Sequence, residues 1–258
     1  MKVFILGLPR TGTQSMHALM EHIGLKSLHF DLEYMDVLNA MDGDFSFLDR
    51  YDAISDLPIP LVYKDLSKRY PEAKFILTLR KDADAFANSI EMLYQFNKRS
   101  WLLCEKIRYL FVYPVWTWLI RYNHQFSLQA KAHRKLFGCS LGVHSDIHTP
   151  PKRENLIKNY NQHKKEVLSF FKDKPEKLYV LTIEQPLQRE ALATFLNTEP
   201  DKIRSFRMDR YRPCDTNWKK IQLGFWMFVR YIKNIVSGYN KEDKQNKAYP
   251  KSEVQSSL

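Results

Sequence analysis

The stretch VFILGLPRTGTQS, residues 3–15, decides the fold class of this 258-residue chain. Its first four residues, Val3 to Leu6, are continuously apolar, as expected of a strand that is buried on both faces. Apolar residues at intervals of three and four follow over Ser15 to Ile23, which is the pattern of an amphipathic helix. A buried strand, a tight loop and a helix form the opening unit of a parallel sheet. The stretch therefore predicts an α/β fold.

The rest of the chain repeats this alternation of strands and helices. The clearest strand is Lys74–Leu79, and a helix is expected directly after it, over residues 84–96. Repeated strand–helix units favour one doubly wound, mostly parallel sheet. The other expected elements are a strand at 52–55, helices at 64–70 and 155–172, a strand at 178–183 and a helix at 187–196.

These elements indicate one domain over residues 1–238. Within it, residues 97–153 are expected to form an insertion of basic, aromatic helices and a loop, on the side that contacts a substrate. From residue 239 the composition shifts to Lys, Asn, Gln and Ser, which is typical of a solvated tail. The predicted boundaries are therefore 1–238 for the domain and 239–258 for the tail.

Charge and cysteine content narrow the class of protein. Forty Lys and Arg against 29 Asp and Glu give a net charge of +11, which favours polyanionic partners such as nucleic acid, anionic lipid or a phosphorylated cofactor. Cys104, Cys139 and Cys214 have neither disulfide-framework nor zinc-site spacing, so free thiols and a cytoplasmic location are expected. No stretch reaches the roughly 20 apolar residues of a membrane span. The eight histidines show no metal-ligand pattern, and no metal is expected.

The loop after the first strand has the composition of an anion site. Backbone N–H groups and the dipole of the following helix favour an anion there. In a nucleoside-triphosphate loop a lysine would occupy the position of Thr13, so a kinase would lack a phosphate-binding cation. Here Arg10 supplies the cation, with hydroxyls at Thr11, Thr13 and Ser15. A simple strand-to-helix turn would account for the glycines but not for this cluster.

The loop resembles the 5′-phosphosulfate loop of sulfotransferases, P-[KR]-[TS]-G-T-[TK]-S, and matches it at all positions but Gln14. Further segments resemble a small subgroup that includes bacterial and flatworm enzymes. They are YDAISDLP at 51–58, RYPEAKFILTLR at 69–80, NYNQHKKEV at 159–167 and KLYVLTIEQPLQREALATFLN at 177–197. The resemblance implies that 3′-phosphoadenosine 5′-phosphosulfate (PAPS) is the co-substrate. The implied loop contacts are Pro9, Arg10, Thr11, Gly12, Thr13, Gln14 and Ser15.

The resemblance also implies a site for the 3′-phosphate. In the family an arginine at the end of the strand and a serine eight residues later hold this group. Here Arg80 ends the strand, but the eighth residue is Asn88 and Ser89 is the ninth. We favour Arg80 with Ser89, because the strand fixes Arg80 and a guanidinium fork matches phosphate. The alternatives are Lys81 with Ser89, or an Arg80 that only pairs with a nearby aspartate.

A third implication concerns the base that takes the proton of the acceptor molecule. Many cytosolic family members have a histidine just before Leu-Pro, whereas this chain has Asp56, as the flatworm-like subgroup does. The resemblance thus implies Asp56 as the base and Arg10 as the residue that neutralises charge on the transferred group. Asp52 and His29 are the next candidates. A turn or helix cap before Pro58 is the structural alternative for Asp56.

The implied activity is transfer of a sulfuryl group from PAPS to a hydroxyl or amine of a small-molecule acceptor. One alternative is a nucleoside or small-molecule kinase. Another is a non-catalytic binder of nucleic acid or of an anionic membrane surface, motivated by the charge and by FWMF at 225–228 beside Arg230 and Lys233. The resemblance itself favours no specific nucleic acid. The basic run Arg204–Arg212 fits either a loop over the 3′-phosphate or a solvated surface.

Overall fold

A computed structural model describes residues 1–29, 38–95, 98, 131–138 and 149–203. Contacts between Cα atoms group Met1–Tyr211 into one unit, to which every described element belongs, and the remainder starts at Arg212. Most of the expected insertion, all three cysteines, the basic run after residue 203 and the expected tail lie outside the described residues. The predicted domain boundary at residue 238 therefore stays a prediction.

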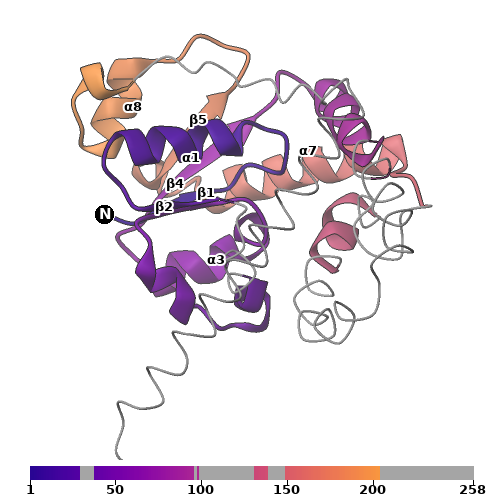
Figure 1. Ribbon diagram of the computed structural model, residues 1–258, viewed down its shortest axis with the longest axis horizontal. Helices are drawn as coiled ribbons and strands as arrows, with labels where there is room; N and C mark the ends of the chain where they lie inside the picture. Colours follow the sequence, from indigo (N-terminus) through magenta and orange to yellow (C-terminus); the bar gives the residue numbers. More distant parts are fainter. Residues whose placement is uncertain (30–37, 96–97, 99–130, 139–148, 204–258) are drawn as a thin grey trace, which may run out of the picture. The chain divides into compact units, whose positions relative to one another are not determined.

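The structure contains a sheet of five parallel strands in the order β2-β3-β1-β4-β5. The chain starts in the central strand, passes outward to β2, returns through β3 and crosses over to β4 (Figure 1). Ile5 of β1 is in register with Ser55 of β3 and with Ile76 of β4. The strands are β1 Val3–Ile5, β2 Ser27–Leu28, β3 Ala53–Ser55, β4 Lys74–Leu79 and β5 Leu178–Thr182.

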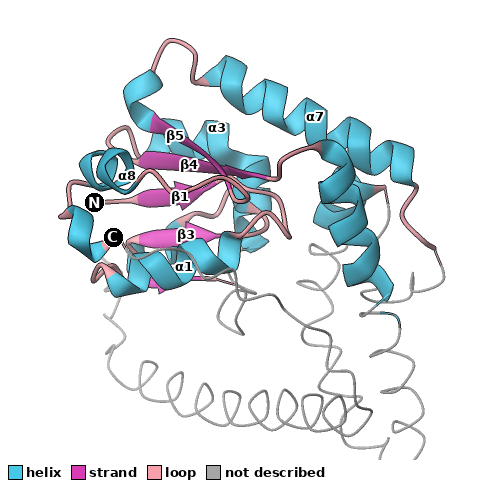
Figure 2. Ribbon diagram, turned by 90° about the horizontal axis from the view of Figure 1, so that it is seen from above, coloured by secondary structure: helices cyan, strands magenta, loops and turns pink. Residues whose placement is uncertain are grey.

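Helices cover both faces of the sheet, as a doubly wound fold requires (Figures 1 and 2). Val3 and Ile5 pack with α1 and α8 on one face, whereas Phe4 and Leu6 pack with α3 and α7 on the other. The predicted α/β fold with a parallel sheet is thus confirmed. The helices are α1 Thr13–His22, α3 Ile59–Arg69, α7 Arg153–Phe170, α8 Arg189–Leu196, and two more over 83–95 and 131–137.

Two features of the observed fold differ from the sequence prediction. The strand β2 is not predicted, because two residues are too few to show any periodicity. The helix α3 begins at Ile59, five residues before the predicted start at Lys64. Its first turn contains Pro60, which is tolerated there because the amide of that position has no partner within the helix. Proline therefore marks the beginning of this helix.

Short 3-10 helices connect the other elements, at Leu38–Asp42, Ser46–Arg50, Pro175–Lys177 and Pro200–Lys202. None of the helices in the described part of the chain is long and apolar enough to span a membrane. Within the same residues, no group of three or more His, Cys, Asp or Glu side chains is arranged to hold a metal ion.

Candidate active site

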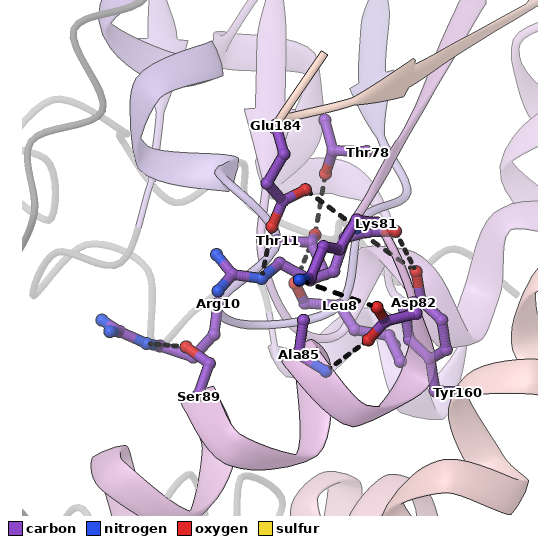
Figure 3. Close-up of polar contacts among 11 residues, drawn as sticks. Leu8, Arg10, Thr11, Thr78, Lys81, Asp82, Ala85, Ser89, Tyr160 and Glu184 are labelled. Atoms are coloured by element: carbon purple, nitrogen blue, oxygen red, sulfur yellow. Dashed lines mark hydrogen bonds and ion pairs between the residues drawn. The ribbon is translucent and has the colours of Figure 1, made fainter.

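The loop between β1 and α1 is fastened to β4 by buried hydroxyl groups (Figure 3). Thr11 Oγ1 donates to the carbonyl of Leu8 at 2.7 Å and lies 2.8 Å from Thr78 Oγ1 of β4. Gly7 leaves room for this contact, because a Cβ there would lie 1.7 Å from Thr78 Oγ1. The hydroxyl of Thr11 is thus used to shape the loop.

The backbone of the loop presents amide groups to an anion. Arg10 and Gly12 have positive φ angles of 73° and 89°, and Gly12 is the N-cap residue of α1. The helix has no side-chain cap and no acidic residue in its first turn. Its first N–H groups therefore lack the side-chain partner that usually satisfies them, and the helix dipole favours a negative charge there. A non-glycine residue held at positive φ, such as Arg10, is typical of functional sites.

Other loop residues flank this amide cluster. Pro9 and Thr13 are buried, Ser15 is half-buried and Gln14 is exposed. Thr13 and Ser15 place hydroxyl groups on the first turn of α1. The loop predicted as a phosphosulfate site is therefore present as a strand–loop–helix turn with its polar groups at the carboxyl end of the central strand. Ligands of open α/β sheets bind at this end.

Arg10 reaches across to the helix over 83–95. Its Nε donates a hydrogen bond to Ser89 Oγ at 3.1 Å (Figure 3), and Ser89 is 6% exposed. The sequence predicts Ser89 beside Arg80, but the contact described in the structure is the one with Arg10. This bond therefore connects one residue of each predicted phosphate site.

Arg80 pairs with Glu184, a residue that is not among the predicted site residues. Its Nε lies 3.1 Å from Glu184 Oε1, and the backbone N–H of Lys81 donates to Glu184 Oε2 at 2.8 Å. The hydroxyl of Tyr160 bonds to both the N–H and the carbonyl of Arg80, each at 3.0 Å. Arg80 thus pairs with Glu184 rather than with a nearby aspartate. The position of Glu184, two residues after the end of β5, is the signal that could have identified it.

The alternative residues for the 3′-phosphate are placed differently. Lys81 has a side chain that is 65% exposed, with its Nζ 4.0 Å from Asp82 Oδ2. Asn88 Oδ1 accepts a hydrogen bond from Arg153 Nη1 at 2.7 Å, so its amide is engaged with the start of α7. These contacts leave Arg80 and Ser89 as the better placed candidates.

Asp56 directly follows β3, and the preceding residue Ser55 is in register with Ile5 of the central strand. It therefore lies at the carboxyl end of the sheet, next to the strand that leads into the loop over residues 9–15. Its φ angle is 74°, and its Oδ1 accepts the N–H of Leu57 at 2.8 Å. This bond is neither an Asx turn, which would reach the N–H two residues on, nor a helix cap, because the N-cap of α3 is Pro58 and has no side-chain cap bond. It uses only one carboxylate oxygen.

The second oxygen of Asp56 faces His29. His29 Nε2 lies 3.9 Å from Asp56 Oδ2, and the two side chains are 16% and 15% exposed. The structure thus brings the predicted base and one alternative together. The other alternative, Asp52, accepts the N–H of Lys26 at 2.9 Å at the amino end of β3, away from the phosphate loop.

His163 of α7 contacts the backbone at the end of β1, just before the loop. Its Nε2 lies 2.8 Å from the carbonyl oxygen of Leu6, and burial lowers the pKa of the imidazole. A neutral imidazole that donates Nε2–H to this carbonyl satisfies both groups. Tyr63 of α3 packs edge-on against the ring, with centroids 6.4 Å apart. His163 therefore serves as a structural support for the end of β1.

Comparisons with known proteins agree with this geometry. A curated relative, "Ava biosynthesis cluster protein M" from Aspergillus versicolor, is 30% identical over 145 residues, which cover 47% of this chain and 55% of the relative. The chain thus spans about half the length of this relative. The sequence profile of the sulfotransferase domain matches residues 2–206, a range that includes every described helix and strand. The chain therefore belongs to the sulfotransferase domain family.

Proposed function

We propose that this protein transfers a sulfuryl group from PAPS to a hydroxyl or amine of a small-molecule acceptor. The observation that carries the proposal is the loop before α1, where an uncapped helix N-terminus, positive φ angles at Arg10 and Gly12 and the Arg10 guanidinium converge. Such a cluster of donors binds oxyanions.

The residues present fit PAPS better than a nucleoside triphosphate. Thr13 occupies the position at which a triphosphate loop has its lysine, and the loop cation is Arg10 instead. A second cationic group, Arg80, lies at the end of the neighbouring strand β4, where a separate phosphate would be held. When bound, PAPS supplies the sulfuryl group and a phosphate as the leaving group. The donors match a ligand with two separate anionic groups.

Each part of the site then has a defined role. The residues Pro9 to Ser15 hold the 5′-phosphosulfate, while Arg80 and Ser89 hold the 3′-phosphate. Arg10 stabilises the negative charge that develops during transfer, as preorganised donors do in enzymes. Glu184 orients the Arg80 guanidinium through the ion pair at its Nε. This division assigns the binding of the donor to four segments: the loop after β1, the residue after β4, the helix over 83–95 and the loop after β5.

Asp56 is the proposed general base. Its Oδ1 is occupied by the N–H of Leu57, so Oδ2 is the atom that accepts the proton of the acceptor's hydroxyl or amine. The low exposure of the side chain favours proton transfer, because less water competes for the carboxylate. The name of the Aspergillus relative, a biosynthesis cluster protein, favours a small molecule as the acceptor. The cytoplasmic location expected from the cysteines stays a prediction.

Thermal unfolding in the presence of three ligands tests the proposed function. Adenosine 3′,5′-bisphosphate, ATP and a single-stranded oligonucleotide are compared at equal concentrations. A ligand at about 100 times its dissociation constant stabilises the folded state by roughly 2.7 kcal/mol. We expect the bisphosphate to raise the melting temperature most. Stabilisation by ATP alone would favour a kinase, and stabilisation by the oligonucleotide alone would favour a nucleic-acid binder.

A further inference from the structure

We infer that His29 acts through the proposed base: it receives from Asp56 Oδ2 the proton that the acceptor loses. This inference rests on the proposed function, in which Asp56 takes that proton. The fold brings His29 and Asp56 together. His29 follows β2 and Asp56 follows β3, and these two strands pair in parallel, so both residues lie at the carboxyl end of the sheet.

Both side chains are restrained by other groups. Asp56 Oδ1 is fixed by the N–H of Leu57 at 2.8 Å, so only Oδ2 faces His29. His29 Nδ1 lies 2.9 Å from Ser55 Oγ, so the opposite ring nitrogen, Nε2, faces Asp56. The Nε2–Oδ2 distance of 3.9 Å exceeds a hydrogen bond, and such contacts often shorten once the substrate binds.

The hydrogen bonds around Ser55 assign the tautomer of His29. Ser55 Oγ donates to the carbonyl oxygen of Leu28 at 3.3 Å, and a carbonyl can only accept. Since a serine hydroxyl carries one hydrogen, it must accept from His29, which places the ring proton on Nδ1. The neutral ring then directs the lone pair of Nε2 at Asp56, where it is able to accept a proton.

In the described part of the chain, α1 contributes the next neighbour of His29. The ring of His17 stacks on that of His29 at 5.6 Å, and His17 Nδ1 lies 2.8 Å from Ser27 Oγ. His17 Nε2 lies 3.6 Å from Glu21 Oε2. Among the described residues, the titratable groups that face this part of the site are therefore Asp56, His17 and Glu21. Glu21 is exposed and partners His17, while Asp56 is the carboxylate that His29 itself faces.

The proton balance of the step is as follows. The acceptor's O–H bond breaks, its proton passes to Asp56 Oδ2, and the freed electron pair forms the new O–S bond while the S–O pair goes to the leaving phosphate. The proton then moves from Oδ2 to the Nε2 lone pair of His29, which restores the carboxylate. His29 releases it to water through its exposed fraction. Histidine suits this role because its side chain titrates between pH 5 and 8.

The first experiment measures the pH dependence of the reaction in His29→Gln. PAPS hydrolysis is the assay, because water must also lose a proton and no natural acceptor is needed; cyclohexanol is added as an alcohol probe. The wild-type rate should depend on pH, because the step needs an unprotonated Nε2 on His29. His29→Gln should lose that dependence and fall at least tenfold in kcat, with bisphosphate affinity within twofold of wild type. His22→Gln, an exposed histidine on α1, is the matched control.

The second experiment is independent of activity. Nitrogen NMR of the ligand-free protein at pH 8 reports which ring nitrogen of His29 carries the proton, and we expect Nδ1. Ser55→Ala should reduce that preference and alter the pH profile. An Nε2–H tautomer in the wild type, or an unchanged pH profile in a folded His29→Gln, would overturn the inference. Full activity of Asp56→Asn would instead overturn the assignment of the base, and with it the role of His29.

Discussion

Arg10 donates its Nε–H to Ser89 Oγ at 3.1 Å across a separation of 79 residues. One guanidinium thereby links the loop that follows β1 to the helix that follows β4. Groups that share a contact are energetically coupled. We therefore expect the losses in bisphosphate affinity caused by Arg10→Ala and Ser89→Ala to be non-additive in the double variant.

The variant Arg10→Ala should lose at least tenfold in affinity for adenosine 3′,5′-bisphosphate, measured by calorimetry. A hydrogen bond to a charged group contributes about 1.5–3 kcal/mol, and its loss leaves an oxyanion without its loop cation. Arg69→Ala is the control, because Arg69 is exposed on α3 and pairs only weakly with Asp49 at 3.7 Å. Equal affinity of Arg10→Ala and wild type would contradict the assignment of the loop.

The 3′-phosphate site can be tested by comparing the bisphosphate with adenosine 5′-phosphate. Arg80→Ala and Ser89→Ala should each reduce the advantage of the bisphosphate, because both side chains would contact the extra phosphate. Asn88→Ala and Lys81→Ala should change it little, since Asn88 bonds to Arg153 and Lys81 is 65% exposed. A Lys81→Ala loss larger than that of Arg80→Ala would move the site to Lys81.

The variant Asp56→Asn should bind the bisphosphate like the wild type but transfer sulfate about 10²–10⁴ times more slowly. An amide keeps the size of the side chain but cannot accept the proton, and a general base contributes a factor of this order. Rapid-mix assays with radiolabelled PAPS and calorimetry separate the two properties. Parallel losses of affinity and rate would indicate a binding role for Asp56.

The variant Gly7→Ala should be strongly destabilised, by about 3 kcal/mol or more in urea unfolding. Its Cβ would lie 1.7 Å from Thr78 Oγ1 and 2.5 Å from Thr11 Oγ1, inside the hydroxyl contacts that fasten the loop. Gly24→Ala is the matched control, because Gly24 has a φ of 90° and no atom within 4 Å of an added Cβ. It should cost only the backbone strain of roughly 1–2 kcal/mol.

Tyr63 should make the protein lose stability at high pH. Burial raises the pKa of Tyr63 to about 12, and the charge of Glu166 adds to the effect. The folded-state pKa lies above the unfolded value of about 10, so the neutral Tyr63 side chain contributes to the free energy of unfolding below pH 10. This contribution is lost as the pH rises toward 12. Tyr63→Phe cannot ionise and should reduce that loss, measured by urea unfolding at pH 8, 10 and 11.

The same variant separates burial from hydrogen bonding. Within the described part of the chain the Tyr63 hydroxyl has no hydrogen-bond partner, so Tyr63→Phe should be neutral or stabilising at pH 7. Tyr70 donates to Asp49 Oδ1 at 2.6 Å, so Tyr70→Phe should cost about 1 kcal/mol. A stability loss in Tyr63→Phe equal to that in Tyr70→Phe would indicate a partner for the Tyr63 hydroxyl.

Long apolar runs made the fold predictable. Val3–Leu6 and Phe75–Leu77 are buried on both faces, and a continuous apolar run is the signature of such a strand. The strand β2 contributes two residues that are held by pairing with β3, so its signal lies in the partner strand rather than in its own sequence. Its absence from the prediction had a consequence for the site, because only β2 places His29 beside Asp56.

The loop residues were predictable as a group, whereas their individual partners were not. The motif over residues 9–15 is local and can be read directly. The contact of Arg10 with Ser89 and that of Arg80 with Glu184 depend on side-chain conformations and on the approach of distant segments. Spacing along the chain places such residues at the same edge of the sheet but does not choose among several cations and acceptors there.

The contacts of Arg153 set a condition on any exchange of the chain between the helix over 83–95 and α7. Its guanidinium donates to Asp84 Oδ1 and Asn88 Oδ1, both at 2.7 Å, and to Glu91 Oε2 at 3.3 Å. These bonds join the helix over 83–95 to the start of α7, and the helix over 131–137 between them buries Leu136 and Phe137 in the core of the domain. An engineered exchange of the intervening residues would therefore have to keep both the Arg153 bonds and this buried helix face.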